Sequence, residues 1–362
     1  MRGFLCTFSV LMCYNGNNLW KEVIFPMKKL KYLFQRLCRL NYRQMFQTVN
    51  KLHKKTGKSR LWLFRDMVKC GTRYGAGYMD YQLCEFYLLT DAQRATYVTR
   101  GINNRLVQLL NKPEAYYKID NKAEFNILYK DFLRRDWLDF REPNFDRFCA
   151  FMEKHEEVVS KPLADACGRG IELLKKSDFA DLKAMFDHLV AIGAGLLEEV
   201  IHQHPDLSAI YPCSVNTYRI VTVRTEGEGH LIYAFIRIGN GGRFVDNLNA
   251  GGMTAPIDLE TGKIQYVAYD KDHIYYDAHP MTGTAFVGYQ LPFWKESVQM
   301  CLDATAVVPE LGYVGWDIAV SPEGPQLIEG NYFPGHDILQ LPPHVPDRIG
   351  MLPQFQKYVK GI

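Results

Sequence analysis

Residues 315–335 read GWDIAVSPEGPQLIEGNYFPG, and this stretch decides the fold. It predicts two short β-strands, because apolar β-prone segments flank a turn rich in Ser, Pro and Gly. A hairpin that closes symmetrically about Glu323 places Asp317 directly opposite Glu329, with Cβ atoms roughly 4.5–5.5 Å apart. The apolar residues on both strands favour a buried sheet over a solvated surface hairpin.

Three oxygen-bearing side chains converge on one face of this hairpin. Asn331 lies two residues beyond Glu329, so the alternation of a strand puts both on the face of Asp317. Two carboxylates this close repel each other unless a cation lies between them. Carboxylate and amide oxygens are the ligands that Mg²⁺ prefers, and Mg²⁺ commonly shares its remaining positions with phosphates. The sequence therefore predicts that Asp317, Glu329 and Asn331 hold Mg²⁺ or Mn²⁺.

The composition predicts a globular protein of a reducing compartment. The chain has 362 residues, of which 47% are hydrophobic, which is enough for one large domain or two to three smaller ones. The nine cysteines include no C-x-x-C pair, so neither a disulfide framework nor a zinc knuckle is expected, and the predicted location is the cytoplasm. Tyr and Phe are abundant without a repeated stacking motif, so no nucleic-acid partner is expected.

Positive charge is concentrated near the start of the chain. Residues 27–73 contain fourteen Lys or Arg and one acid, about +13, which leaves −10 for the rest of the chain. Residues 30–46 form a basic amphipathic pattern that fits peripheral contact with an anionic membrane or glycan, or else the solvated outer face of a helical region. Residues 1–26 contain an apolar run without a convincing cleavage site and are expected to be an extension before Met27.

A second set of residues resembles a phosphate-binding arrangement. The short strand 157–162 contains Lys161 at its end and runs into a glycine loop that includes Gly168 and Gly170. A lysine supplies point charge, and glycines let backbone N–H groups approach phosphate oxygens. The alternative is a strand-end lysine that reaches solvent.

The remaining segments add a hinge and a β-rich half. The strand 195–201 contains Glu198 and Glu199 near its end. This suits a hinge whose backbone hydrogen-bonds to the edge of an adenine ring; the alternative is an ordinary strand end. Arg219 and Arg237 interrupt apolar strands, and an arginine inside a sheet needs a phosphate or carboxylate partner. Further elements are expected as helices at 28–112, 123–133, 179–189 and 291–305, with a short connector at 145–151.

Taken in order, these motifs resemble the ATP-grasp superfamily. The similarity is greatest to its sugar-transfer-associated branch and the α-L-glutamate ligase type, and it extends over residues 121–335. GWDI…LIEGNYFPG is its most specific part, and Asn247-Leu248…Gly251-Gly252 is next. The leading region also resembles that branch through GAGYMDYQLCEFYLL. The resemblance implies an α+β fold in which two subdomains grip ATP, preceded by a helical region.

The resemblance also implies residue roles. Lys161 and Lys122 would contact nucleotide phosphates together with the loop glycines. Glu198 would meet the adenine amino group, helped by the backbone of Glu199 and Ile201. Asp317, Glu329 and Asn331 would hold the metal. Arg237, Arg219 and Asn247 would steady an acyl-phosphate, and either His204 or Asp206 would contact the ribose.

The expected function is therefore an ATP- and Mg²⁺-dependent ligase that joins carboxylate and amine substrates, small molecules or glycans, in cell-surface polysaccharide or sugar modification. An ATP-grasp kinase and a non-catalytic nucleotide-binding scaffold of a polysaccharide assembly are the alternatives. The expected organisation has four parts: an extension at 1–26, a basic helical region at 27–114, an N-terminal ATP-grasp subdomain at 115–205, and a β-rich C-terminal subdomain with the metal site at 206–362.

Overall fold

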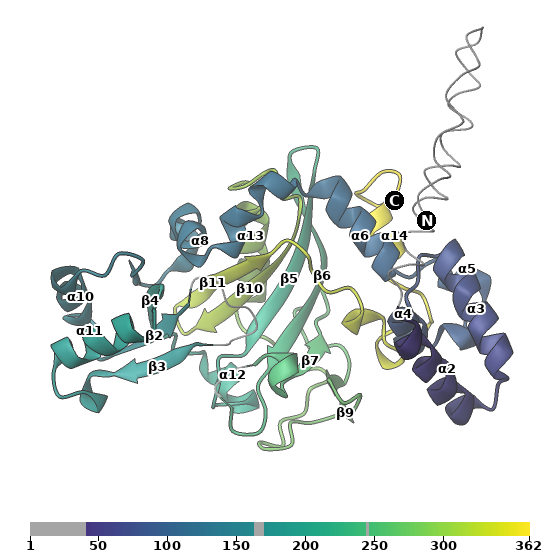
Figure 1. Cartoon of the computed structure of the whole chain (residues 1–362), viewed down its shortest axis with the longest axis horizontal. Helices are drawn as coiled ribbons and strands as arrows, with labels where there is room; N and C mark the ends of the chain where they lie inside the picture. Colours follow the sequence, from purple (N-terminus) through teal and green to yellow (C-terminus); the bar gives the residue numbers. More distant parts are fainter. Residues whose placement is uncertain (1–40, 163–169, 244–245) are drawn as a thin grey trace, which may run out of the picture. The chain divides into compact units, whose positions relative to one another are not determined.

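The structure is a computed structural model that describes residues 41–162, 170–243 and 246–362 (Figure 1). The chain divides into two compact units, Met1–Arg65 and Asp66–Ile362. The predicted extension at 1–26 and most of the amphipathic pattern at 30–46 lie outside the described residues. Within the described ranges, no helix combines the length and the apolar character needed to cross a membrane.

Helices make up the first part of the described chain and recur between the strands. The α-helices are α2 (Tyr42–Thr56), α3 (Arg60–Arg73), α4 (Tyr78–Leu83), α5 (Asp91–Arg94), α6 (Arg100–Leu110), α7 (Tyr117–Asp120), α8 (Lys122–Leu128), α9 (Lys130–Leu133), α10 (Phe145–Met152), α11 (Leu182–Ala191), α12 (Pro205–Ile210), α13 (Trp294–Ala304) and α14 (Leu352–Gln356). The 3₁₀ helices are η1 (Phe86–Leu88), η2 (Pro113–Ala115), η3 (Lys176–Asp178), η4 (Leu248–Ala250), η5 (Ile338–Gln340) and η6 (Pro342–His344).

The strands are β1 (Trp137–Asp139), β2 (Glu157–Lys161), β3 (Glu172–Lys175), β4 (Leu196–Glu199), β5 (Thr217–Thr225), β6 (Glu228–Ile238), β7 (Met253–Pro256), β8 (Ala268–Asp270), β9 (Tyr275–Tyr276), β10 (Tyr313–Ser321) and β11 (Gly324–Asn331). The predicted strands at 157–162, 195–201 and in the central hairpin are confirmed to within a few residues. The expected connector at 145–151 is the helix α10. The helix expected at 123–133 is confirmed but is divided into α8 and α9 at Tyr129, which ends α8 with a φ of −101°.

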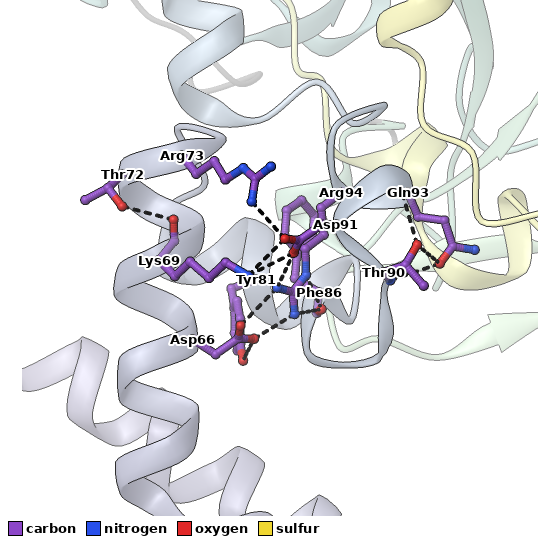
Figure 2. Close-up of polar contacts among 10 residues, drawn as sticks. All are labelled: Asp66, Lys69, Thr72, Arg73, Tyr81, Phe86, Thr90, Asp91, Gln93 and Arg94. Carbon is purple, nitrogen blue, oxygen red and sulfur yellow. Dashed lines mark hydrogen bonds and ion pairs between the residues drawn. The ribbon is translucent and has the colours of Figure 1, made fainter.

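A buried polar network joins the helices α3, α4 and α5 (Figure 2). Arg94 donates to Asp66 at 2.7 Å, and its Nε donates to the Phe86 carbonyl at 2.9 Å. Tyr81 donates its hydroxyl to the same Asp66 at 2.8 Å. Because Arg94 is buried and the Asp66 side chain is only 10% exposed, loss of either one leaves an uncompensated charge, so this network holds the three helices together.

The smaller sheet has the strand order β1-β4-β2-β3, and all its neighbours are antiparallel. One face carries apolar side chains that pack with residues of α10 and α11, such as Phe148, Met152 and Leu189. Figure 1 shows both helices beside this sheet. In this register Val159 faces Glu198 and Lys161 faces Leu196. The side chains of Lys161 and Glu198 therefore lie on the same face of the sheet.

The larger sheet has the order β11-β10-β5-β6-β7-β8-β9 and is also antiparallel throughout. Helix α13 packs against β5, β6 and β11. Trp316, Ile318 and Leu327 belong to the hydrophobic cluster on that side. The polar residues of the same strands must therefore project from the other face.

The central hairpin closes differently from the predicted symmetry. Its turn consists of Pro322 and Glu323 alone, because Ser321 pairs with Gly324. A regular ladder from that turn would not place Asp317 opposite Glu329. The register shifts by one residue between Asp317 and Ile318, which leaves Ile328 as the extra residue of a β-bulge. The bulge restores the predicted pairing of Asp317 with Glu329, which the structure confirms.

Candidate active site

A row of charged side chains crosses four adjacent strands of the larger sheet. Asp317 on β10 pairs with Arg219 on β5 on one side and with Glu329 on β11 on the other. Arg237 on β6 lies opposite Thr217, which is two residues from Arg219 and therefore on the same face. We call Arg219, Arg237, Asp317 and Glu329 the hairpin cluster.

The two arginines hold Asp317 in its ionised form. Asp317 is buried, and both its oxygens accept from Arg219, one of them at 2.7 Å from Nη2. Arg237 adds a further contact at 2.8 Å. Burial opposes the charge of Asp317, but the guanidinium groups outweigh it and hold the pKa of Asp317 at about 2. The sequence predicted that both arginines need an anionic partner, and this partner is Asp317.

Glu329 is the member of the cluster without a cation of its own. Its side chain is open to solvent, although protein atoms surround it densely. Those surroundings and the neighbouring charge of Asp317 raise the pKa of Glu329 to about 7. The direction of this shift follows from the like charge alone, since two adjacent carboxyls do not ionise independently. A cation placed beside Glu329 would remove the repulsion.

Asn331 continues the same face of the hairpin. It lies opposite Gly315, and its Oδ1 accepts from the Phe333 N–H at 2.8 Å, which leaves that oxygen one further lone pair. Gly315 has a steric reason to be glycine, because a Cβ there would lie 3.0 Å from the Cδ of Arg219. The structure thus brings the three predicted metal ligands to one face of one hairpin.

A second charged group lies on the smaller sheet, and we call Arg135, Lys161 and Glu198 the lysine cluster. The Lys161 ammonium donates to the Glu198 carboxylate at 2.6 Å, and Arg135 Nε donates to it at 3.0 Å. Asn126 donates to its other oxygen at 3.1 Å. Burial opposes ionisation of Glu198, but the two cations prevail and hold its pKa well below its usual range.

Arg135 also links the smaller sheet to the central hairpin. Its Nη1 donates to the Leu327 carbonyl at 2.6 Å, two residues before Glu329. Its buried Nη2 has no hydrogen-bond partner among the described residues. Sequence reasoning missed Arg135 and Asn126, because neither belongs to a motif. The available signal for Arg135 was the pair of arginines at 134–135, which lies just before an apolar strand.

The predicted hinge residues lie at the end of β4 and in the segment that follows it. The Glu199 carboxylate accepts from the Asp136 N–H at 2.8 Å, and Ile201 lies in the irregular segment that follows. A polar cavity of about 380 Å³ adjoins this segment. It is lined by Lys154, His155, Glu157, Lys175, Glu199 and His202, among others. The two ribose candidates lie just beyond, where the His204 Nδ1 accepts from the Asp206 N–H and begins α12.

Three further predicted site residues lie outside both clusters. Lys122 is the first residue of α8, Asn247 precedes η4, and Gly170 adopts the left-handed conformation with a φ of 67°. Gly168 lies outside the described residues. The expected contacts of these four residues with ATP or the acyl-phosphate therefore stay predictions.

The leading helical region contributes directly to the loop that follows the predicted metal ligands. Asp80 on α4 and His336 are both buried, with 3.1 Å between Oδ1 and Nε2. The other Asp80 oxygen accepts from the N–H groups of Gly77 and Arg100. Asn103 on α6 donates to the Pro334 carbonyl at 3.1 Å. The segment after Asn331 is therefore held by α4 and α6.

Comparison with solved structures finds similarity at low identity. D-alanyl-alanine synthetase A from Vibrio cholerae O1 biovar eltor str. N16961 matches at 15% identity and a TM-score of 0.41, covering 68% of this chain and 62% of that one. ATP-grasp ligase PsnB, complexed with a phosphomimetic variant of its minimal precursor, Mg and ADP, matches at 15% and 0.38, covering 69% and 63%. D-alanine–D-alanine ligase from Bacillus anthracis matches at 16% and 0.40, covering 70% and 72%. The chain spans less than two thirds of the length of the first two.

A search of curated proteins finds no match. A family model described as sugar-transfer associated ATP-grasp matches residues 101–346, which is more than half of the chain. The match includes both charged clusters. The chain belongs to the sugar-transfer associated ATP-grasp family and has the ATP-grasp fold predicted from its sequence.

Proposed function

We propose that this protein is an ATP- and Mg²⁺-dependent ligase that joins a carboxylate to an amine through an acyl-phosphate, in the modification of a cell-surface sugar or polysaccharide. The observation that carries the proposal is the hairpin cluster with Asn331. It places two carboxylates, an amide and two guanidinium groups on one face of neighbouring strands. Membership of the sugar-transfer associated family supports both the ATP chemistry and the sugar context.

The donor set fits Mg²⁺ or Mn²⁺. Asp317, Glu329 and Asn331 offer only oxygen ligands. The dense protein surroundings and the neighbouring charge of Asp317 raise the pKa of Glu329, and a cation beside it would relieve that repulsion. When bound, the cation would neutralise charge on the nucleotide phosphates. A softer metal such as Zn²⁺ would favour nitrogen or sulfur ligands, which these three residues do not supply.

The chain's own residues would position ATP and the substrate. We propose that Lys161, Lys122 and the backbone at Gly168 and Gly170 hold the phosphates. Lys161 would exchange Glu198 for phosphate oxygens, since the lysine cluster has two cations for one carboxylate. Phosphoryl transfer depends mainly on such positioning and charge neutralisation.

Arg237, Arg219 and Asn247 would steady the acyl-phosphate. Arg219 contacts Asp317 through two nitrogens, Nε and Nη2, whereas Arg237 contacts it through Nη1 alone. Arg237 therefore has more freedom to turn a second N–H toward a substrate oxygen. The backbone groups of Glu199 and Ile201 would hydrogen-bond to the edge of the adenine ring. His204 or Asp206 would meet the ribose.

The reaction balances without an additional reagent. A substrate carboxylate oxygen attacks the γ-phosphorus of ATP, the bond to the β-phosphate oxygen breaks, and ADP leaves. The amine nitrogen then attacks the acyl carbon, and the C–O bond to phosphate breaks. The products are an amide, ADP, phosphate and one proton. No nucleophilic side chain of the protein is required.

We further propose that ATP lies between the subdomains 115–205 and 206–362, and that the protein works in the cytoplasm. Each proposed subdomain contains one of the two sheets. The five cysteines of the described ranges are all unpaired, which suits a reducing compartment.

The test measures ADP release from ATP with candidate carboxylates and amines, with mass spectrometry of the product. Wild type should release ADP and form an amide. Glu329→Gln should reduce ADP release at least about 100-fold, because one metal ligand loses its charge. Glu323→Gln, an exposed carboxylate on the turn of the same hairpin, serves as the matched control and should leave turnover unchanged.

Other outcomes would identify the alternatives. A phosphorylated product without an amide would indicate an ATP-grasp kinase. Nucleotide binding without turnover of any carboxylate and amine pair would indicate a non-catalytic scaffold. Unchanged turnover in Glu329→Gln would contradict the metal assignment.

A further inference from the structure

The helical hairpin of residues 41–65 exposes a strip of large apolar side chains. Phe46 on α2 and Phe64 on α3 stack with ring centroids 5.7 Å apart and ring planes 3° apart. Tyr42 is one helical turn from Phe46, and Leu61 is one turn from Phe64, so all four lie along one side of the hairpin. Tyr42, Phe46 and Leu61 are 46%, 51% and 59% exposed. We call these four residues the apolar strip.

Cations surround the apolar strip, and this segment has no acid. Residues 41–65 contain Arg43, Lys51, Lys54, Lys55, Lys58, Arg60 and Arg65 but neither Asp nor Glu. All of these cations except Lys58 are exposed. On the helical repeat, Arg43 follows Tyr42 on the outward side of α2, and Arg65 lies one turn from Leu61 on the outward side of α3. Cationic side chains therefore flank the apolar strip on both helices.

The combination distinguishes between kinds of partner. A polyanion such as RNA or a sulfated glycan would satisfy the cations but would leave phenylalanine and leucine in water. A neutral apolar protein surface would cover the strip but leave the positive charge uncompensated. A bilayer rich in anionic lipids offers both an acyl boundary for the apolar side chains and phosphate groups for the cations.

We propose that residues 41–65 dock this protein on the surface of an anionic membrane, with the apolar strip inserted at the headgroup boundary. The tyrosine of the strip suits that boundary, because its ring has an apolar body and a polar tip. This inference goes beyond the proposed ligase function and does not depend on it. Lipid binding can be measured without ATP, so failure of either proposal leaves the other standing.

The test is sedimentation of the full chain with vesicles of phosphatidylcholine alone or mixed with phosphatidylglycerol. Wild type should bind the anionic vesicles and not the neutral ones, and salt should weaken the binding. Arg43→Gln with Arg65→Gln should weaken it about 25-fold, about fivefold for each charge. Phe46→Ser with Leu61→Ser should weaken it at least about tenfold.

Matched controls lie elsewhere on the surface. Lys357→Gln with Lys360→Gln removes two exposed cations outside the segment, and Leu109→Ser removes an exposed leucine from another helix. Both controls should bind like wild type, and circular dichroism should show that every variant is folded. Equal binding to both kinds of vesicle, or wild-type binding by the strip variant, would overturn the proposal. Binding to heparin or RNA that survives loss of the strip while vesicle binding is absent would assign the surface to a polyanion instead.

Discussion

The hairpin cluster and the lysine cluster both combine carboxylates with cationic side chains, but in different proportions. The hairpin cluster has two carboxylates and two guanidinium groups, and Asp317 takes both guanidinium contacts, which leaves Glu329 uncompensated. The lysine cluster has one carboxylate for two cations. One therefore has a carboxylate to spare for a metal ion, and the other has positive charge to spare for a phosphate.

The largest expected effect comes from removing the anion on which the hairpin cluster depends. Asp317→Asn leaves Arg219 and Arg237 without a carboxylate inside the sheet, and we expect it to lower the free energy of unfolding by about 3–5 kcal/mol. Urea denaturation measures this loss. Glu329→Gln should keep nearly wild-type stability, because the residue it replaces is the uncompensated one. Equal stability of the two variants would contradict the claim that Asp317, and not Glu329, neutralises the two arginines.

Removing Lys161 should affect binding more than stability. Lys161→Ala leaves Glu198 with Arg135 and Asn126, so the cluster stays neutralised and the unfolding free energy should change by no more than about 1 kcal/mol. The KM for ATP should rise about 10- to 100-fold through loss of a charge-assisted contact. Steady-state kinetics measure it, with Lys183→Ala, which replaces an exposed lysine of α11, as the control. An unchanged KM would contradict the assignment of phosphate binding to this cluster.

The two clusters should respond differently to pH. The pKa of Glu329 is raised to about 7, so below that pH the carboxyl holds a proton that a cation must displace. Mg²⁺ affinity should therefore fall as pH falls, approaching about tenfold for each pH unit well below 7. Calorimetric titration of Mg²⁺ at about pH 8 and about pH 6 measures this change.

The lysine cluster provides the comparison. Its carboxylate, Glu198, has a pKa well below the usual range and stays ionised over the same interval. Metal-free nucleotide binding should therefore change much less between these pH values. A parallel loss in both measurements would indicate a general effect of pH on the protein and not the titration of Glu329.

The smallest expected effect concerns the helical region that supports the hairpin side alone. Asp80→Asn removes the charge that faces His336 while keeping an acceptor for the Gly77 and Arg100 N–H groups. We expect a loss of about 1 kcal/mol in unfolding free energy and a rise of about threefold in the KM for Mg·ATP. Thermal denaturation and kinetics measure these changes. If Asp80→Asn instead changed the affinity for metal-free nucleotide, the contact between Asp80 and His336 would support the lysine cluster.

Much of the larger sheet could be predicted from the sequence. Alternating apolar runs gave the strands, and the pairing of Asp317 with Glu329 is confirmed by the register. The assumed centre of symmetry was nevertheless wrong, because it treated the turn as centred on Glu323 and did not foresee the bulge. A sequence does not readily reveal a bulge, since one unpaired residue costs little and carries no distinctive side chain here.

The partners within the lysine cluster could not be predicted in the same way. Lys161 and Glu198 were predicted separately to contact different parts of the nucleotide. The structure shows that they pair with each other. Arg135 reaches them from a position 63 residues before Glu198 in the chain. Contacts between a loop residue and two distant strands depend on tertiary packing, which local patterns do not encode.

The bulge at Ile328 also gives Glu329 a part in how the hairpin folds. A ladder without it, closed by the same two-residue turn, would set Glu329 against Trp316, on the side of the hydrophobic cluster. Forcing a carboxylate into that apolar layer is costly, so the slipped hairpin is a poor competitor. Glu329, which we assign to the metal, therefore also disfavours the wrong strand register. A leucine in its place would remove this cost and make the slipped hairpin more favourable.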